Sequence, residues 1–178
     1  MPDIKNIEEI KEYPLSDDDI HKYLPSAKII LYNELQTYDD IRQLLPNPGD
    51  YFIFLYQDSP NSGHWCCVIR HKNEIEFFDP YGKYPDSELK WVSADVRGGL
   101  GIHDRYLTKL FDVCPFNIVY NDEDYQQEKE GVNTCGRHVV YRCMNKKLSL
   151  EQYHKLMKDQ KNKGCNFDCV VTNNVNVH

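Results

Sequence analysis

The chain has 178 residues, of which 40% are apolar, and this length suits one domain over residues 1–178 better than two. Its formal charge of −7 disfavours a broad surface for nucleic acid or anionic lipid, because Lys and Arg are needed to neutralise phosphates. No apolar run approaches the roughly 20 residues that span a bilayer, and the polar, acidic start does not resemble a signal peptide. We therefore expect a soluble protein that is neither secreted nor bound to a membrane.

The first half of the chain predicts two short helices followed by three strands. Ser16 caps the first helix, three aspartates occupy the turn where carboxylates favour the helix dipole, and Pro25 ends it. Thr37 begins a second helix in the same way. The last two strands form a hairpin across the three-residue turn HKN. The predicted ranges are helices over 16–24 and 37–45 and strands over 51–56, 65–70 and 74–79.

The second half predicts a helix over 105–111, a strand over 116–121 and helices over 136–147 and 150–162. In the predicted helix over 136–147, Val139, Val140 and Cys143 have the spacing of a helix face that packs on a sheet. Ser149 caps the last helix. The elements together predict an α+β fold, with a central, mainly antiparallel β-sheet flanked by helices.

The stretch EGVNTCGRHVV places Cys135 at the start of a predicted helix. A thiolate there is stabilised by unpaired backbone N–H groups and by the helix dipole, which favours the nucleophilic form near neutral pH. Asn133 or Thr134 can cap the helix, and Gly136 leaves space for a substrate backbone. The same N–H groups can bind a tetrahedral oxyanion. A small buried residue is the alternative interpretation of Cys135.

A thiolate mechanism needs a base and a group that orients the base, and His64 and Asp79 are the candidates. Both lie at the open end of the predicted hairpin. Counting from the HKN turn places Trp65 opposite Asp79 and His64 diagonally adjacent, where the carboxylate can hold Nδ1–H. A surface histidine and a turn-forming aspartate are the alternatives. His103 and His138 are other candidate bases, although His138 would point away from a thiol at the helix start.

Three motifs, HW, FFDPYG and NTCGR, occur in this order and carry a family resemblance. Together they resemble the adenain-type and ubiquitin-like-protein-specific cysteine proteases, above all the maturation proteases of adenoviruses, virophages and other DNA viruses. The resemblance spans about residues 15–172 and implies a papain-like adenain/SUMO-protease fold with the nucleophile at a helix N-terminus. It implies that His64, Asp79 and Cys135 are catalytic. It also implies that Trp65 narrows the cleft so that glycine fits beside the scissile bond.

The resemblance further implies a glutamine upstream of the cysteine that donates to the oxyanion. Gln126 and Gln127 lie further from Cys135 than the family's glutamine does, so EKEGV would hold an insertion of one or two residues. The approach YNDEDYQ resembles that of several viral relatives and favours Gln126, and Gln127 stays open. A solvated loop is the alternative interpretation of this pair.

The seven cysteines are an odd number and scattered, which is a poor match to a disulfide framework and fits a reducing, intracellular compartment. Cys165 and Cys169 have no second pair at metal spacing, and Cys66 and Cys67 point to opposite faces of a strand, so we expect no metal and no other cofactor. Cys114 lies upstream of the nucleophile, where the adenovirus enzyme carries a cysteine linked to an activating peptide. A buried thiol fits Cys114 better.

The sequence therefore predicts a cysteine endopeptidase that cleaves after glycine, at Gly-Gly-X or Gly-X sites, in viral capsid or core precursors during virion maturation. The alternative is a deSUMOylase or deubiquitinase, whose substrate tail also ends in Gly-Gly. An effector-type acetyltransferase shares the order of His, acid and Cys but needs a basic pocket, and a non-catalytic binding module is the remaining hypothesis. We expect a monomer that acts on protein substrates in the virion, the host cytoplasm or the virus factory.

Overall fold

The computed structural model describes residues 4–60, 62–161 and 165–177. Five strands form one sheet in the order β1-β2-β3-β4-β5, with bounds β1 Lys28–Leu31, β2 Tyr51–Ser59, β3 Ser62–Arg70, β4 Glu74–Phe78 and β5 Asn117–Tyr120. The central pairs β2–β3 and β3–β4 are antiparallel, whereas β1–β2 and β4–β5 at the edges are parallel. The α+β class is thus confirmed, and the sheet is mixed.

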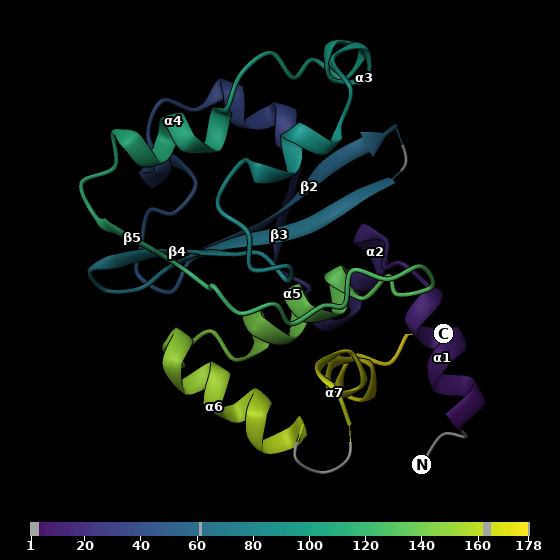
Figure 1. Ribbon diagram of the computed structural model, residues 1–178. Coiled ribbons are helices and arrows are strands. Elements are labelled where there is room, and N and C mark those ends of the chain that lie inside the picture. Colours follow the sequence, from purple (N-terminus) through teal and green to yellow (C-terminus); the bar gives the residue numbers. More distant parts are fainter. Residues whose placement is uncertain (1–3, 61, 162–164, 178) are drawn as a thin grey trace.

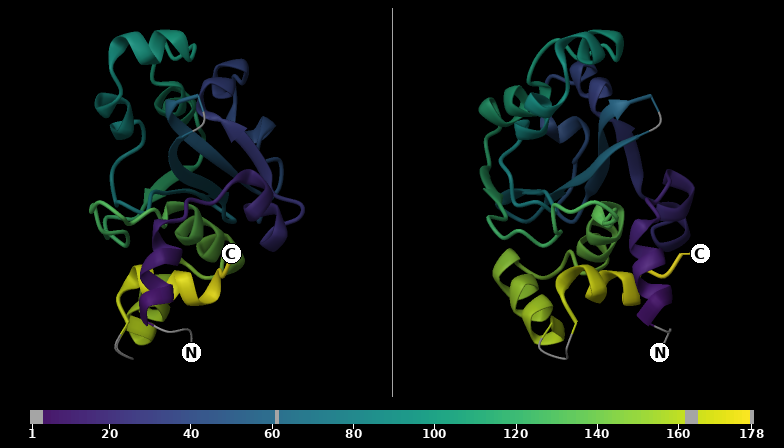
Figure 2. Two further views of the ribbon diagram at one scale, coloured as in Figure 1. Left: turned by 90° about the vertical axis from the view of Figure 1, so that its right-hand side faces the viewer. Right: turned by 45° about the vertical axis from the view of Figure 1, so that its right-hand side comes forward.

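Helices cover both faces of the sheet (Figure 1). The α-helices are α1 Ile4–Glu12, α2 Asp17–Tyr23, α3 Ala94–Gly99, α4 Tyr106–Asp112, α5 Cys135–Met144, α6 Leu150–Lys161 and α7 Phe167–Asn174, and the 3-10 helices are η1 Tyr32–Thr37, η2 Ile41–Gln43 and η3 Ser87–Trp91. α5, α6 and α7 lie on one side, and α3 and α4 lie on the other. Figure 2 shows α1 beside α7, so the first and last helices of the described chain pack together. Within the described ranges, no helix has the length and apolarity to cross a membrane.

Each face of the sheet has its own apolar core, because alternate residues of β2 and β3 point to opposite sides. The core on the α5 side includes Ile53, Trp65, Cys67, Val139, Val140, Tyr153 and Val171. The core on the α4 side includes Phe52, Phe54, Cys66, Val68, Phe77, Leu107 and Leu110. The sheet is therefore a buried layer between two sets of helices. Packing on both of its faces holds the ends of the strands in place.

Most of the predicted helix starts are confirmed. Ser16 accepts the Asp19 N–H at the start of α2, and Ser149 accepts the Gln152 N–H at the start of α6. The helix predicted over 37–45 is wrong, because the Asp40 carboxylate accepts the Arg42 N–H and closes only the 3-10 turn η2. The sequence patterns also missed α1, β1, α3 and α7.

The predicted register of the β3–β4 hairpin is wrong by one residue. The His71 N–H donates to the Glu74 carbonyl, so the loop has two residues instead of three, and Cys67 pairs with Phe78. Continuing this register places Cys66, not Trp65, opposite Asp79. Because side chains alternate along a strand, the shift puts His64, Cys66 and Asp79 on one face and Trp65 on the other.

A buried ion pair fastens α5 to the centre of the sheet. The Arg142 guanidinium donates to both oxygens of Glu76, at 2.7 and 2.8 Å, and neither side chain is exposed. His71 lies 2.8 Å from the same carboxylate, and burial, which opposes the charge, is outweighed by His71 and Arg142, so the pKa of Glu76 is lowered. Such a pair is costly to break because the remaining charge stays buried.

We predict that Arg142→Met lowers the free energy of unfolding by about 3–5 kcal/mol, because it leaves Glu76 buried without its main partner. Urea denaturation measures this loss. The double variant Arg142→Met with Glu76→Leu should recover much of it. The matched control is Arg42→Met, which removes an exposed pair with Asp40 and should cost about 1 kcal/mol or less. Equal losses for the two arginines would contradict the prediction.

Candidate active site

Cys135 is the first residue of α5, as the sequence predicted. Thr134 occupies the cap position, but its hydroxyl donates to Asp168, and no described side chain caps the helix. Asn133, the other predicted cap, donates its side-chain amide to the Glu12 carbonyl. The first N–H groups of α5 therefore remain available to a bound group, which suits an oxyanion.

A groove of about 590 Å³ leads to Cys135. Its walls carry Leu15, Ile29, Ile30, Leu31, Leu55 and Trp65, together with Gly63 and Pro60 from the β2–β3 turn region. The groove also has the polar residues Ser16, Asp17, Glu34 and Ser62 in its lining, and it is large enough for an extended peptide segment beside the thiol.

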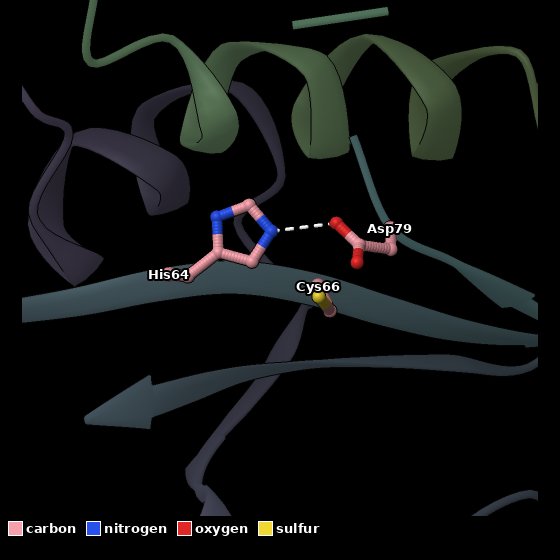
Figure 3. A group of neighbouring side chains, drawn as sticks. All are labelled: His64, Cys66 and Asp79. Carbon is pink, nitrogen blue, oxygen red and sulfur yellow. Dashed lines mark hydrogen bonds and ion pairs between the residues drawn. The ribbon is translucent and has the colours of Figure 1, made fainter. Parts of the chain in front are cut away.

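His64 and Asp79 form a short hydrogen bond in a buried site (Figure 3). His64 Nε2 lies 2.6 Å from Asp79 Oδ1. The sequence analysis assigned the carboxylate to Nδ1, and this detail is wrong, because Nε2 is the nitrogen that meets Asp79. Nδ1 is the ring nitrogen that Asp79 leaves unused, and the Cys135 thiol is near enough to His64 to raise its pKa.

The surroundings of His64 favour its charged form. Burial alone would lower the pKa of His64, but Cys66, the Asp79 carboxylate and the Cys135 thiol outweigh burial and hold the pKa well above its ordinary value. The Tyr81 ring stacks on the imidazole with centroids 4.5 Å apart and planes 12° from parallel. An imidazolium fixed in this way can pair with a thiolate at Cys135.

Trp65 lines the groove and packs against Gly136 at the start of α5. The Trp65 indole N–H donates to the Leu15 carbonyl at 3.0 Å, which fixes the ring. A Cβ at Gly136 would lie 2.9 Å from Leu15 Cβ and 3.1 Å from Trp65 Cδ1. Gly136 thus lets Leu15 and Trp65 pack against the start of α5, which differs from the open space for substrate expected from the sequence.

The two glutamines differ in environment. Gln126 is buried, and its side-chain amide donates to the Val132 carbonyl at 3.3 Å, which leaves a second N–H on the same nitrogen. The side chain of Gln127 is exposed. This contrast favours Gln126 as the donor near Cys135.

Asp168 of α7 is a buried residue near the site that the sequence analysis did not identify. One of its oxygens accepts from the Thr134 hydroxyl at 2.6 Å and lies 2.9 Å from His138 Nε2. Its other oxygen accepts the Gln127 N–H at 3.1 Å. Asp168 therefore ties the glutamine loop to the residue that precedes Cys135. In the segment GCNFDC, only the two cysteines were interpreted. The aspartate between them was the signal that could have identified Asp168.

The remaining predicted candidates lie apart from this arrangement. His138 is fully buried, and burial, only partly offset by Asp168, lowers its pKa, so it stays neutral in a structural role. His103 lines a different cavity, beside Asp86 and Arg97. Cys165 and Cys169, which the sequence analysis left unpaired, form a disulfide.

Comparisons with known proteins give one clear relative. Over 158 residues, which are 88% of this chain and 90% of the other protein, the chain is 34% identical to "Uncharacterized protein V9" of Sputnik virophage. No protein-family model matches the chain. The solved structure "Crystal Structure of ASFV pS273R protease" is similar with a TM-score of 0.45 and 11% identity, over 79% of this chain. The chain spans 61% of the length of that protein.

We predict that Asp79→Asn lowers the pKa of His64, because the negative charge that favours the imidazolium is lost. Titration of labelled histidine by NMR measures the shift, and the imidazolium should deprotonate at lower pH than in the wild type. Asp39→Asn, an exposed change, is the control and should leave the titration of His64 unchanged. An unchanged His64 titration in Asp79→Asn would show that the pair is not coupled.

We also predict that Asp168→Asn slows alkylation of Cys135 by iodoacetamide. The asparagine side chain cannot accept hydrogen bonds from Thr134, His138 and Gln127 together, and these bonds hold the residue that precedes Cys135. The free energy of unfolding should fall by about 1–3 kcal/mol. Alkylation of the half-buried Cys114 in the same sample serves as the control, because a general loosening would accelerate it. Unaltered Cys135 alkylation would assign Asp168 a purely structural role.

Proposed function

The chain belongs to the family of the uncharacterized protein V9 of Sputnik virophage, and we propose that it is a cysteine endopeptidase that cleaves after glycine. The observation that carries the proposal is the hydrogen bond of 2.6 Å between His64 Nε2 and Asp79, beside a cysteine that begins α5 and raises the pKa of His64. A base held between an acid and a thiol at a helix N-terminus is the arrangement that thiol acylation requires.

In the proposed mechanism, Cys135 Sγ attacks the carbonyl carbon of the scissile peptide after its proton has passed to His64. The tetrahedral intermediate collapses when the C–N bond breaks, and His64 gives its proton to the departing amine. Water then attacks the thioester, with His64 as the base, and releases the acid and the free thiol. Asp79 orients the ring and stabilises its charge throughout.

The oxyanion is proposed to bind between the Cys135 backbone N–H and the side-chain amide of Gln126. The second N–H of that amide is free for this purpose, because the first donates to Val132. Comparable donors contribute about 3–4 kcal/mol to the transition state. Gln127 is the weaker candidate because its side chain points to solvent.

Selectivity for glycine is proposed to come from the wall that Trp65 forms beside Cys135. The indole is anchored to Leu15 and packed on Gly136, so it cannot move aside for a substrate side chain. Residues without a Cβ pass this constriction, as the resemblance to adenain-type proteases also implies.

The proposed substrates are viral capsid or core precursor proteins, cleaved during virion maturation. The virophage relative supports a viral setting, and the motifs HW, FFDPYG and NTCGR support the protease class. An isopeptidase acting on SUMO or ubiquitin conjugates is the second candidate, because the same glycine-selective groove accepts a Gly-Gly tail.

We predict that the wild type cleaves a Gly-Gly-X peptide after glycine, whereas Cys135→Ser and His64→Ala lose turnover by several orders of magnitude. Mass spectrometry of the products measures the cleavage position. A SUMO conjugate is incubated in parallel. Efficient conjugate cleavage without peptide turnover would reject the maturation protease in favour of the isopeptidase.

Alkylation provides the control that is independent of substrate choice. Cys135 should react with iodoacetamide at neutral pH faster than Cys143, and His64→Ala should remove the difference. A wild type in which Cys135 reacts no faster than Cys143 would favour the non-catalytic binding module. Acetyl transfer from acetyl coenzyme A without any hydrolysis would instead support the acetyltransferase.

A further inference from the structure

A second thiol lies against the candidate catalytic pair and has no part in the proposed mechanism. Cys66 follows His64 by two residues on β3, and the hairpin register brings Asp79 opposite it. One donor atom from each of His64, Cys66 and Asp79 lies within 4.8 Å of the other two. All three side chains are buried, with exposed fractions of 8%, 0% and 0%.

Asp79 has an unused oxygen in this cluster. Its Oδ1 accepts from the Tyr81 N–H at 2.9 Å and pairs with His64. Its Oδ2 is buried and has no hydrogen-bond partner among the described residues. Figure 3 shows this second oxygen on the side of the Cys66 sulfur. A buried carboxylate oxygen without a partner is costly, so the site favours a positively charged group there.

We propose that His64, Cys66 and Asp79 form a binding site for Zn²⁺ whose occupancy blocks catalysis. Nitrogen, sulfur and carboxylate oxygen are the donors that zinc prefers, and the sulfur selects zinc over magnesium or calcium. When the metal binds, the Cys66 thiol and His64 Nε2 each release a proton to solvent, and the thiolate and the carboxylate together neutralise the two charges of the ion. Three protein ligands leave the fourth position to water.

Neighbouring groups support the ligands. Asn121 accepts the Asp79 N–H at 3.0 Å and donates to the Asp79 carbonyl at 2.6 Å, which fixes the residue from both sides. Tyr81 stacks on the imidazole and limits its rotation. Such outer contacts orient metal ligands before the ion arrives.

Inhibition follows from which ring nitrogen the metal occupies, and this part rests on the proposed function. Zinc on Nε2 of His64 leaves the single ring proton on Nδ1, the nitrogen that remains for Cys135. His64 then cannot take the thiol proton, so acylation stops. The metal also separates His64 from Asp79, which removes the orienting hydrogen bond.

Metal binding is tested first in the Cys135→Ser protein, where activity plays no part. Titration calorimetry with Zn²⁺ and absorption spectroscopy with Co²⁺ should show one site with a thiolate ligand. Adding Cys66→Ala, or Cys66→Ser if the alanine variant fails to fold, should weaken binding about tenfold or more and remove the thiolate-to-cobalt band. The matched control is Cys67→Ala, the adjacent buried thiol on the other face of β3, which should keep both.

Inhibition is then measured on proteins with Cys135, each relative to its own rate without zinc. Zinc should inhibit the wild type and Cys67→Ala at similar concentrations, and Cys66→Ala should need about tenfold more. Equal inhibition of Cys66→Ala would overturn the zinc site and place the inhibiting metal at Cys135. A thiolate band that survives Cys66→Ala in the Cys135→Ser protein would also overturn it and place the metal at another thiol. If the wild type shows no peptidase activity while the Cys66-dependent metal site is present, the proposed function fails and the site stands.

Discussion

The hydrogen bond between His64 Nε2 and Asp79 Oδ1 determines the chemistry available at the end of the sheet. It occupies one ring nitrogen with the carboxylate and leaves the other unused, while the thiol at the start of α5 helps to raise the pKa of the ring. Because both partners are buried, water does not compete for the bond, and the negative charge of Asp79 acts on the imidazole at short range. Asn121 binds the backbone of Asp79, and the Tyr81 ring stacks on the imidazole of His64, so the imidazole has one orientation.

The position of Cys135 depends on two further polar contacts that hold α5 at its ends. At the C-terminal end, Arg142 binds Glu76 in the middle of the sheet. At the N-terminal end, Asp168 binds the hydroxyl of Thr134, one residue before Cys135. Buried charges add little net stability once desolvation is included, but they are satisfied in only one arrangement. They therefore fix where the helix starts relative to the strand that carries His64.

The proposed zinc site shares His64 and Asp79 with the candidate catalytic pair, because the same strand pairing positions both. The register that aligns His64 with Asp79 brings Cys66 to the same face of β3, and the thiol then lies beside the one carboxylate oxygen without a partner. A shift of one residue would remove the thiol from the cluster. The proposed activity and the proposed metal sensitivity thus both depend on one strand pairing.

Local patterns predicted much of the fold because they reflect interactions within a few residues. Ser16 and Ser149 cap their helices through neighbours in sequence, and the spacing of Val139, Val140 and Cys143 shows the face of α5 that packs on the sheet. The helix predicted from Thr37 is wrong for an equally local reason, since the Asp40 side chain favours a tight turn. β1 was missed because a four-residue edge strand has too short a pattern to recognise.

The sequence by itself determined the residue types and their local settings: a cysteine at a helix start, a histidine and an aspartate at two strand ends, and a tryptophan beside the histidine. Only the tertiary structure decided which ring nitrogen meets Asp79, that Gln126 is buried while Gln127 faces solvent, and that Asp168 joins the loop to the helix. The physical reason is that a hairpin register and a contact between α7 and α5 depend on which of several similar pairings buries the most surface and satisfies the most polar groups. That choice involves residues far apart in the chain, and no short pattern contains it.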